Sequence, residues 1–421
     1  MTHTRVSLAV PWFALLLAVG CGDDAGLYAG DTAEGAGATA TAPGSSDGLY
    51  EGGGEGAADG GADSAADGGT PKEGGEGGQG GEPGQLTAGE WRDLDHWQFW
   101  LELMQKQEWS SMATRWGFAT QQRYAVVVES DGAHVADASV TLLAGEQALW
   151  SARTDARGEA ELFAGLFAAA PQGPFSLQVS VAGQSTVVDE VASGGTPIVV
   201  PVAVTEAPAK VLDLMFVIDT TGSMGDELSY LQVELADVID RVREQVGADY
   251  KFRVSVNFYR DSGDEYLVRP FPFTEDIQEA IADLGKQSAD GGGDWPEAVD
   301  AALADAIDEH AWSESAVARL CFIVLDAPPH DGGQVLADVQ RSVEAAAAKG
   351  VRMVPLAASG VDKELEFLLR FTAVATGGTY TFLTNDSGIG GTHIEPTIGE
   401  YQVEILNDLL VRVISASVVD N

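Results

Sequence analysis

One short loop collects the side chains best suited to chemistry. It reads Asp219-Thr-Thr221-Gly-Ser223, so a carboxylate and two hydroxyls alternate with other residues. Oxygen ligands at this spacing suit a hard divalent cation such as Mg²⁺. The loop leads into a predicted helix, whose N-terminal dipole repels cations, so nearby carboxylates must outweigh that dipole. The spacing therefore predicts a cation site.

The elements around this loop alternate between strand and helix. Predicted strands cover residues 211–218, 252–258, 320–325, 351–356 and 379–382, and predicted helices cover 226–246, 273–281, 296–310, 334–349, 363–375 and 401–414. Buried-type strands that alternate with helices indicate βαβ units and an α/β fold with a doubly wound, mainly parallel sheet. In such sheets ligands bind outside the C-terminal ends of the strands, where Asp219 falls.

This pattern resembles the von Willebrand factor A (VWA) domain, a Rossmann-like fold, over residues 210–418. The metal-ion-dependent adhesion site of that family has the signature Asp-x-Ser/Thr-x-Ser, and Asp219, Thr221 and Ser223 match it without a gap. The resemblance implies that the two hydroxyls bind Mg²⁺, Ca²⁺ or Mn²⁺ directly and that the aspartate acts through water. It also implies that a protein ligand binds through the metal.

Two further loops complete such a site in the family. Asp326 matches the aspartate at the end of the central strand, and Asp294 stands in a Gly-Gly-Asp-x-Pro-Glu-Ala stretch where many members carry a threonine ligand. Asp294 also has a second interpretation. With Pro296 and Glu297 after it, Asp294 looks like a capping-box start to the helix predicted from residue 296. The two roles are compatible, and as a ligand Asp294 adds a negative charge that favours tighter metal binding.

Several nearby residues have simpler interpretations. His330 follows two prolines close to the predicted site and is expected to be a loop residue that forms hydrogen bonds rather than a metal ligand. Asp226 and Glu227 stand in the first turn of a predicted helix, where acids interact favourably with the dipole. Cys321 lies within an apolar run and is expected to be a small core residue.

Catalytic alternatives fit the sequence poorly. Asp219-Thr-Thr-Gly-Ser223 superficially resembles the loop of aspartic proteases, but it has an extra residue, occurs once and lies in an α/β pattern. A phosphate-transferring site would want a second aspartate where Thr221 stands. Neither a phosphate-binding Gly-x-x-x-x-Gly-Lys loop nor a His-Glu-x-x-His motif occurs. We therefore expect a binding protein and not an enzyme.

Residues 122–205 differ in pattern from the rest. Short apolar or alternating segments are separated by Gly, Pro and Asp turns, which indicates a small all-β sandwich. A Thr-Asp-x-x-Gly turn at residues 154–158 resembles the carboxypeptidase regulatory-like (transthyretin-like) family, with glycine supplying the positive φ. Such domains are usually spacers or binding modules, so no chemistry is expected here.

An aromatic segment at residues 90–118 precedes the sandwich. Apolar residues at 97, 100, 101 and 104 follow helical spacing, and further tryptophans stand at 91, 109 and 116. One interpretation is a short amphipathic helical segment that caps a neighbouring domain. The other is an exposed aromatic patch that docks a partner or a sugar.

The N-terminus has the character of an export signal. Residues 1–21 combine a short basic start, an apolar core and a final Gly20-Cys21, which resembles a bacterial lipobox with Cys21 as the lipidated residue; Ala18 stands where that motif prefers leucine. Residues 22–89 are rich in glycine and acids and are predicted to be a disordered linker. We expect an exported protein, lipid-anchored in the bacterial cell envelope at the outer membrane or cell surface.

The net charge of the chain limits the classes of molecule that it can bind. The chain has 421 residues and a formal net charge of −42, with 23 lysines and arginines. Such a surface repels phosphate backbones, so nucleic acid is excluded as a partner. The sequence predicts a tethered protein that binds a protein ligand through a metal ion. The alternative is a structural member of an envelope complex whose metal is purely architectural.

Overall fold

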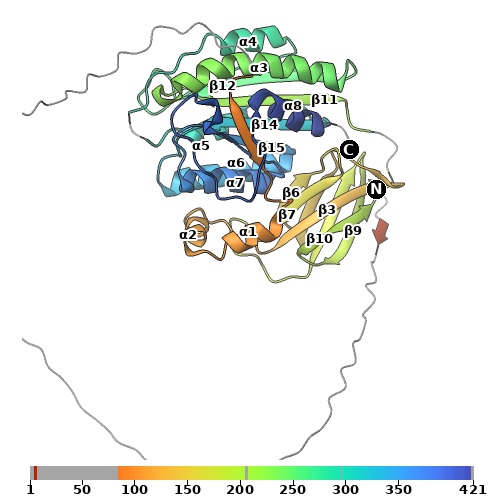
Figure 1. The fold of residues 1–421 in the computed structure, drawn as a ribbon. Helices are drawn as coiled ribbons and strands as arrows, with labels where there is room; N and C mark the ends of the chain where they lie inside the picture. The colour runs from red at the N-terminus through yellow and green to blue at the C-terminus, as the bar shows by residue number, and fades with distance from the viewer. Residues whose placement is uncertain (1–3, 7–83, 204–206, 294, 419–421) are drawn as a thin grey trace, which may run out of the picture. The chain divides into compact units, whose positions relative to one another are not determined.

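A computed structural model describes residues 4–6, 84–203, 207–293 and 295–418 (Figure 1). Cys21, nearly all of the predicted signal and linker, and the predicted ligand Asp294 lie outside these residues.

One large sheet organises the C-terminal half. Its eight strands run in the order β13-β12-β11-β14-β15-β16-β2-β17. The five central strands, β12, β11, β14, β15 and β16, are parallel to one another. The outer strands β13, β2 and β17 are antiparallel to their neighbours. This arrangement confirms the predicted α/β fold with a mainly parallel sheet. The strands are β2 (Thr87–Trp91), β11 (Val211–Asp219), β12 (Lys251–Tyr259), β13 (Val268–Arg269), β14 (Ala318–Leu325), β15 (Val351–Ala357), β16 (Tyr380–Leu383) and β17 (Glu404–Ile405).

Helices cover both faces of this sheet (Figure 1). Alternate residues of β11 enter two different cores: Leu214 and Phe216 pack with α3, α4 and α8, whereas Met215 and Val217 pack with α5, α6 and α7. Burial on both faces explains why β11 is a continuous apolar run. The helical elements are η1 (Gly222–Met224), α3 (Gly225–Val246), α4 (Ile277–Leu284), α5 (Val299–Ala304), η2 (Asp305–Glu309), α6 (Gly333–Lys349), α7 (Lys363–Thr376), η3 (Asn385–Ser387) and α8 (Leu406–Ala416).

Three predicted helix starts were wrong. The helix predicted from residue 273 begins at Ile277, because the side chain of Asp276 accepts from the backbone of Gln278 and caps it. The helix predicted from residue 296 begins at Val299, with Ala298 at the N-cap and no side-chain cap bond. Asp294 itself lies outside the described residues, so its capping role stays a prediction. The helix predicted from residue 401 begins at Leu406, since β17 precedes it.

Residues 84–89, the end of the predicted linker, belong to the folded structure. Thr87–Trp91 forms β2, which pairs with β16 on one side and β17 on the other. Just before it, the carboxylate of Glu234 in α3 accepts backbone hydrogen bonds from Gly84 at 2.8 Å, Gln85 at 2.9 Å and Leu86 at 3.3 Å. These long-range hydrogen bonds hold residues 84–86 at the start of β2, although the local sequence there does not predict a strand.

The aromatic segment forms two short helices, α1 (Trp97–Leu103) and α2 (Gln107–Arg115). Trp100 and Trp109 are fully buried and contact Phe367 of α7. The segment thus packs on the large domain as an amphipathic helical cap. The alternative of an exposed aromatic docking patch was wrong, because the main rings of this segment serve the core.

Residues 123–201, together with Thr4–Val6, form two smaller sheets, and residues 123–201 of both sheets share one core. In one sheet the order is β1-β9-β8-β5-β6, and the other contains β10, β3 and β4 with β7 beside β3. The strands are β1 (Thr4–Val6), β3 (Arg123–Ser130), β4 (Ala133–His134), β5 (Ser139–Ala144), β6 (Gln147–Arg153), β7 (Glu159–Phe163), β8 (Phe175–Val181), β9 (Gln184–Val191) and β10 (Gly194–Pro201). No helix within the described residues is long and apolar enough to span a bilayer.

Candidate metal centre

The predicted site residues Asp219 and Asp326 leave neighbouring strands at the same edge of the large sheet. Asp219 is the last residue of β11, and Asp326 follows β14 directly; the register pairs Ile218 with Val324 just before them. After β11 the chain continues to β12 on one side of this strand pair, and after β14 it continues to β15 on the other side, so the strand order reverses direction between β11 and β14. Such a switch point is where open α/β sheets bind ligands.

The glycine-rich loop that contains Gly291, Gly292 and Glu297 covers this edge. It is hydrogen-bonded to the loops that follow β11 and β14. The backbone of Gly222 donates to the carbonyl of Gly291 at 3.1 Å, which joins the loop to the end of β11. The backbone of Glu297 donates to the carbonyl of Pro328 at 2.9 Å, which joins it to the loop after β14. Three segments far apart in sequence therefore meet at one edge.

The first loop orients its own oxygen atoms. Oδ1 of Asp219 accepts from the backbone N–H of Thr221 at 2.8 Å and from the Thr221 hydroxyl at 2.7 Å. The hydroxyls of Thr221 and Ser223 lie 3.4 Å apart. The structure thus brings together the three residues of the predicted motif, with Asp219 and Thr221 buried and Ser223 exposed.

Three carboxylates at this site each retain a buried oxygen without a hydrogen-bond partner among the described residues. These atoms are Oδ2 of Asp219, Oδ1 of Asp326 and Oε2 of Glu297. Burial, followed by repulsion from Asp326, raises the pKa of Asp219 to about 7, although the hydrogen bonds from Thr221 oppose the shift. Burial also raises the pKa of Asp326. Unpaired buried carboxylate oxygens are costly unless a cation, a proton or water compensates them.

Glu297 is the site residue that sequence reasoning missed. It was assigned only a capping role, but its side chain is 3% exposed and faces the same cavity as Thr221, Ser223 and Asp326. Burial, and then repulsion from Asp219 and other nearby acids, raises the pKa of Glu297 to about 8. The sequence feature that could have identified Glu297 as a site residue is its position shortly after three successive glycines, 291–293.

Gly292 permits this approach. Its φ of +70° lies in the left-handed region, and a Cβ there would come within 2.8 Å of Oε1 of Glu297 and 3.0 Å of Cβ of Thr221. Any side chain would displace either the acid or the hydroxyl residue. The glycine run thus has a steric role at the site.

The neighbouring residues take different roles. His330 is bonded to Asp261 at 2.6 Å and does not line the cavity, which agrees with its predicted role as a loop hydrogen-bonder. Asp226 is exposed at the start of α3. Glu227 was predicted to interact only with the helix dipole, but it is buried and accepts from the hydroxyl and backbone of Ser359. Glu227 therefore joins α3 to the loop after β15.

The cavity at this edge has a volume of about 480 Å³ and opens beside Trp295. The Trp295 side chain is 49% exposed, one of few large apolar side chains in the described residues that reach solvent to this extent. A hollow with polar oxygens in its wall and an exposed indole at its rim suits the docking of another molecule.

The described donor set fits a hard divalent cation. No three His, Cys, Asp or Glu side chains of the described residues form a ready-made metal cage. The set is instead mixed: the hydroxyls of Thr221 and Ser223 lie beside carboxylates whose free oxygens lack partners. Oxygen-only sets of this kind suit Mg²⁺, Ca²⁺ or Mn²⁺. Asp294 lies outside the described residues, so its predicted ligand role stays a prediction.

Comparison with known proteins agrees with the geometry. Residues 213–365 match the family model of the von Willebrand factor A domain, which spans β11 to the first turn of α7. No curated protein matches the chain. The chain thus contains a VWA-type domain, and such a domain suggests a protein-interaction or adhesion-type role.

Proposed function

We propose that this protein binds a protein ligand through a divalent cation at the edge of its VWA-type domain. The observation that carries the proposal is that two hydroxyls meet three buried carboxylate oxygens that lack partners among the described residues, at the ends of β11 and β14 and in the loop that covers them. A cation would compensate these charges, and an open cavity beside Trp295 gives a partner access.

The proposed cation would be held by Thr221 and Ser223, with Asp219 and Asp326 as the principal charges. Asp294 and Glu297 are further acids of the loop that closes the site. The cation would supply a Lewis-acidic position for an oxygen of the partner. The chain's own residues orient this set: Thr221 is fixed by its two bonds to Asp219, and Gly292 leaves room for Glu297.

Metal binding is tested by calorimetric titration of the full chain with Mg²⁺, Ca²⁺ and Mn²⁺. Thr221→Val removes one hydroxyl at nearly constant shape and is expected to weaken binding at least tenfold, and Asp219→Asn should do likewise. Asp226→Asn is the matched control, because it removes an exposed acid from the same region. Heat of binding that is equal in all three variants would argue against the site.

Asp294 is tested separately. As a ligand it adds a negative charge to the set, so Asp294→Thr should weaken Mg²⁺ binding in the absence of any partner. Unchanged affinity in this variant would remove Asp294 from the ligand set without touching the other residues.

The binding role is distinguished from the architectural alternative by partner capture. Proteins captured from envelope extract by the wild-type chain should be lost with chelator and lost with Thr221→Val. Trp295→Ala should reduce capture while leaving Mg²⁺ affinity unchanged, since the indole lies at the rim. Capture that resists chelation and both substitutions would favour a purely architectural metal. Turnover of a substrate that disappears in Asp219→Ala would contradict a binding protein.

We propose that the domain is tethered to the bacterial envelope through lipid on Cys21, a proposal that rests on the N-terminal sequence. Palmitate labelling in a bacterial host should mark the wild type and fail in Cys21→Ser. Cys321→Ser is the matched control, because Cys321 is buried in β14 and should not affect labelling.

A further inference from the structure

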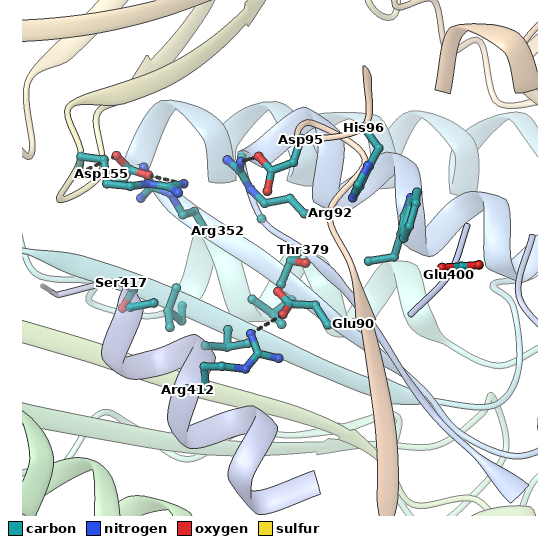
Figure 2. Close-up of a pocket in the computed structure, with 18 residues that line it drawn as sticks. Glu90, Arg92, Asp95, His96, Asp155, Arg352, Thr379, Glu400, Arg412 and Ser417 are labelled. Carbon is teal, nitrogen blue, oxygen red and sulfur yellow. Dashed lines mark hydrogen bonds and ion pairs between the residues drawn. The ribbon is translucent and has the colours of Figure 1, made fainter. Parts of the chain in front are cut away.

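A second cavity, of about 500 Å³, is lined by the residues drawn in Figure 2 and, as its lining residues show, lies at the opposite edge of the large sheet from the proposed metal site. Its wall includes residues from the starts of two parallel strands, Leu320 of β14 and Arg352 of β15, and Ala416 from the end of α8. The turn before β7 contributes Asp155 and Arg157. The cavity therefore lies where the small sheets, strand β2 and the VWA-type domain meet.

Arginines are concentrated in this cavity. Arg92, Arg157, Arg352 and Arg412 line it, although the chain has only 23 lysines and arginines against 65 acids. Figure 2 shows Arg92 and Arg352 along one side of the cavity and Arg412 on the other. A guanidinium presents a planar fork of N–H donors that matches carboxylate and phosphate groups.

Three of these arginines already have carboxylate partners. Arg92 pairs with Asp95, Arg157 bonds to Glu159 at 2.9 Å, and Arg412 bonds to Glu90 at 2.6 Å. The acids of the wall are thus largely matched by these cations.

Arg352 is the exception. Among the described residues Arg352 forms no ion pair within 4.0 Å, and its guanidinium donates to the carbonyl of Arg153 at 3.3 Å. Burial, opposed by Asp155 but reinforced by Arg92 and Arg157, lowers its pKa. A half-buried guanidinium that faces a cavity, forms no ion pair among the described residues and has Asp155 as its main opposing charge can receive a further anion.

A second polar group in this wall also lacks a partner. The side chain of Thr379 is 6% exposed, and its hydroxyl has no hydrogen bond among the described residues. Figure 2 places Thr379 between Arg92 and Glu90, within the cavity wall. A buried hydroxyl without a partner is costly, and an anion at this position would accept its hydrogen bond.

Part of the wall is aliphatic, beside polar lining residues such as His96, Glu400 and Ser417. Leu320, Val354, Val413 and Ala416 supply aliphatic surface next to the arginines. A bare inorganic anion would leave this surface facing water, whereas a ligand with a hydrocarbon part would cover it.

We propose that this cavity binds a small organic anion, a carboxylate or phosphate joined to an apolar body. The anionic group pairs with Arg352 and accepts from Thr379, and the body lies against the aliphatic wall. This site is independent of the proposed metal site, which lies at the other ends of the same strands.

The full chain is titrated calorimetrically with four probes: hexanoate, hexyl phosphate, hexanol and inorganic phosphate. At least one of the two hexyl anions should bind, and it should bind more tightly than hexanol, which lacks the charge, and inorganic phosphate, which lacks the body. The better of hexanoate and hexyl phosphate identifies the anionic group. Failure of both to bind, or equal binding of hexanol, overturns the proposal.

Substitutions locate the binding. Arg352→Gln should raise the Kd for the better anion about tenfold or more, and Thr379→Val should raise it about threefold to tenfold. Arg243→Gln, which removes an exposed guanidinium from α3, should leave the Kd unchanged, as should Thr221→Val at the opposite edge. Equal Kd values for Arg352→Gln and Arg243→Gln overturn the proposal. If Arg352→Gln does not fold, the near-isosteric Thr379→Val decides it.

Discussion

Asp93 and Arg370 form a buried ion pair between residues 277 positions apart. Oδ2 of Asp93 accepts from Nε of Arg370 at 2.9 Å, and Oδ1 accepts from Nη2 at 2.6 Å. Arg370 also donates to Glu366 at 3.0 Å and to the carbonyl of Thr397 at 2.7 Å. This network fixes the segment between β2 and α1 to α7, so the N-terminal aromatic segment is part of the large domain.

Asp93→Asn should lower the free energy of unfolding by about 3 kcal/mol, because it leaves Arg370 buried with one carboxylate fewer. Urea denaturation measures the loss. Asp95→Asn, two residues away on a side chain that is 55% exposed, is the control and should cost less than about 1 kcal/mol. An equal loss of unfolding free energy in the two variants would show that the buried Asp93–Arg370 pair contributes no more to stability than an exposed acid.

Glu234→Gln should loosen the entry to β2. The carboxylate accepts three backbone N–H bonds from residues 84–86, and an amide oxygen replaces charged acceptors only in part. We expect a loss of about 2 kcal/mol and faster amide hydrogen exchange at Gln85 and Leu86. Glu244→Gln changes an exposed acid of the same helix and should alter neither quantity. Unchanged exchange in Glu234→Gln would contradict this role.

Asp137→Asn should weaken the junction between the small sheets and the large domain. Asp137 accepts from Arg319 at 2.9 Å and from Arg153 at 2.6 Å, and both members of the Asp137–Arg319 pair are buried. Loss of the charge should cost about 3 kcal/mol in chemical unfolding. Asp131→Asn is the control, since both aspartates have positive φ, which asparagine also tolerates. A stability loss shared by the control would point to backbone strain instead.

Cys321 should be unreactive in the folded protein. It is fully buried in β14, and burial raises the pKa of its thiol to about 12. A raised thiol pKa means that the neutral form persists at pH 8, and the thiolate is the reactive form. Iodoacetamide followed by peptide mass spectrometry should leave Cys321 unmodified until denaturant is added. Modification at the same rate in native and denatured protein would refute this expectation.

Local pattern was sufficient for most of the large domain. The apolar run of β11, the spacing of Asp219, Thr221 and Ser223, and the buried character of Cys321 all follow from residue type and period. Strands buried on both faces must be apolar, and a loop whose donors are adjacent in sequence needs no distant partner to be recognised. These features depend on neighbours along the chain.

Other features were decided by contacts across the fold. Glu297 became a site residue because its backbone bonds to Pro328, which carries its side chain to the metal-site cavity. Residues 87–91 became a strand because β16 and β17 offered unpaired edges and Glu234 held the preceding backbone. Local residue propensity cannot predict such contacts, because the stabilising group lies far away in the sequence. The sequence by itself therefore determined the fold class and the loop of Asp219, Thr221 and Ser223, whereas tertiary structure decided how that loop is covered and that residues 87–91 join the sheet.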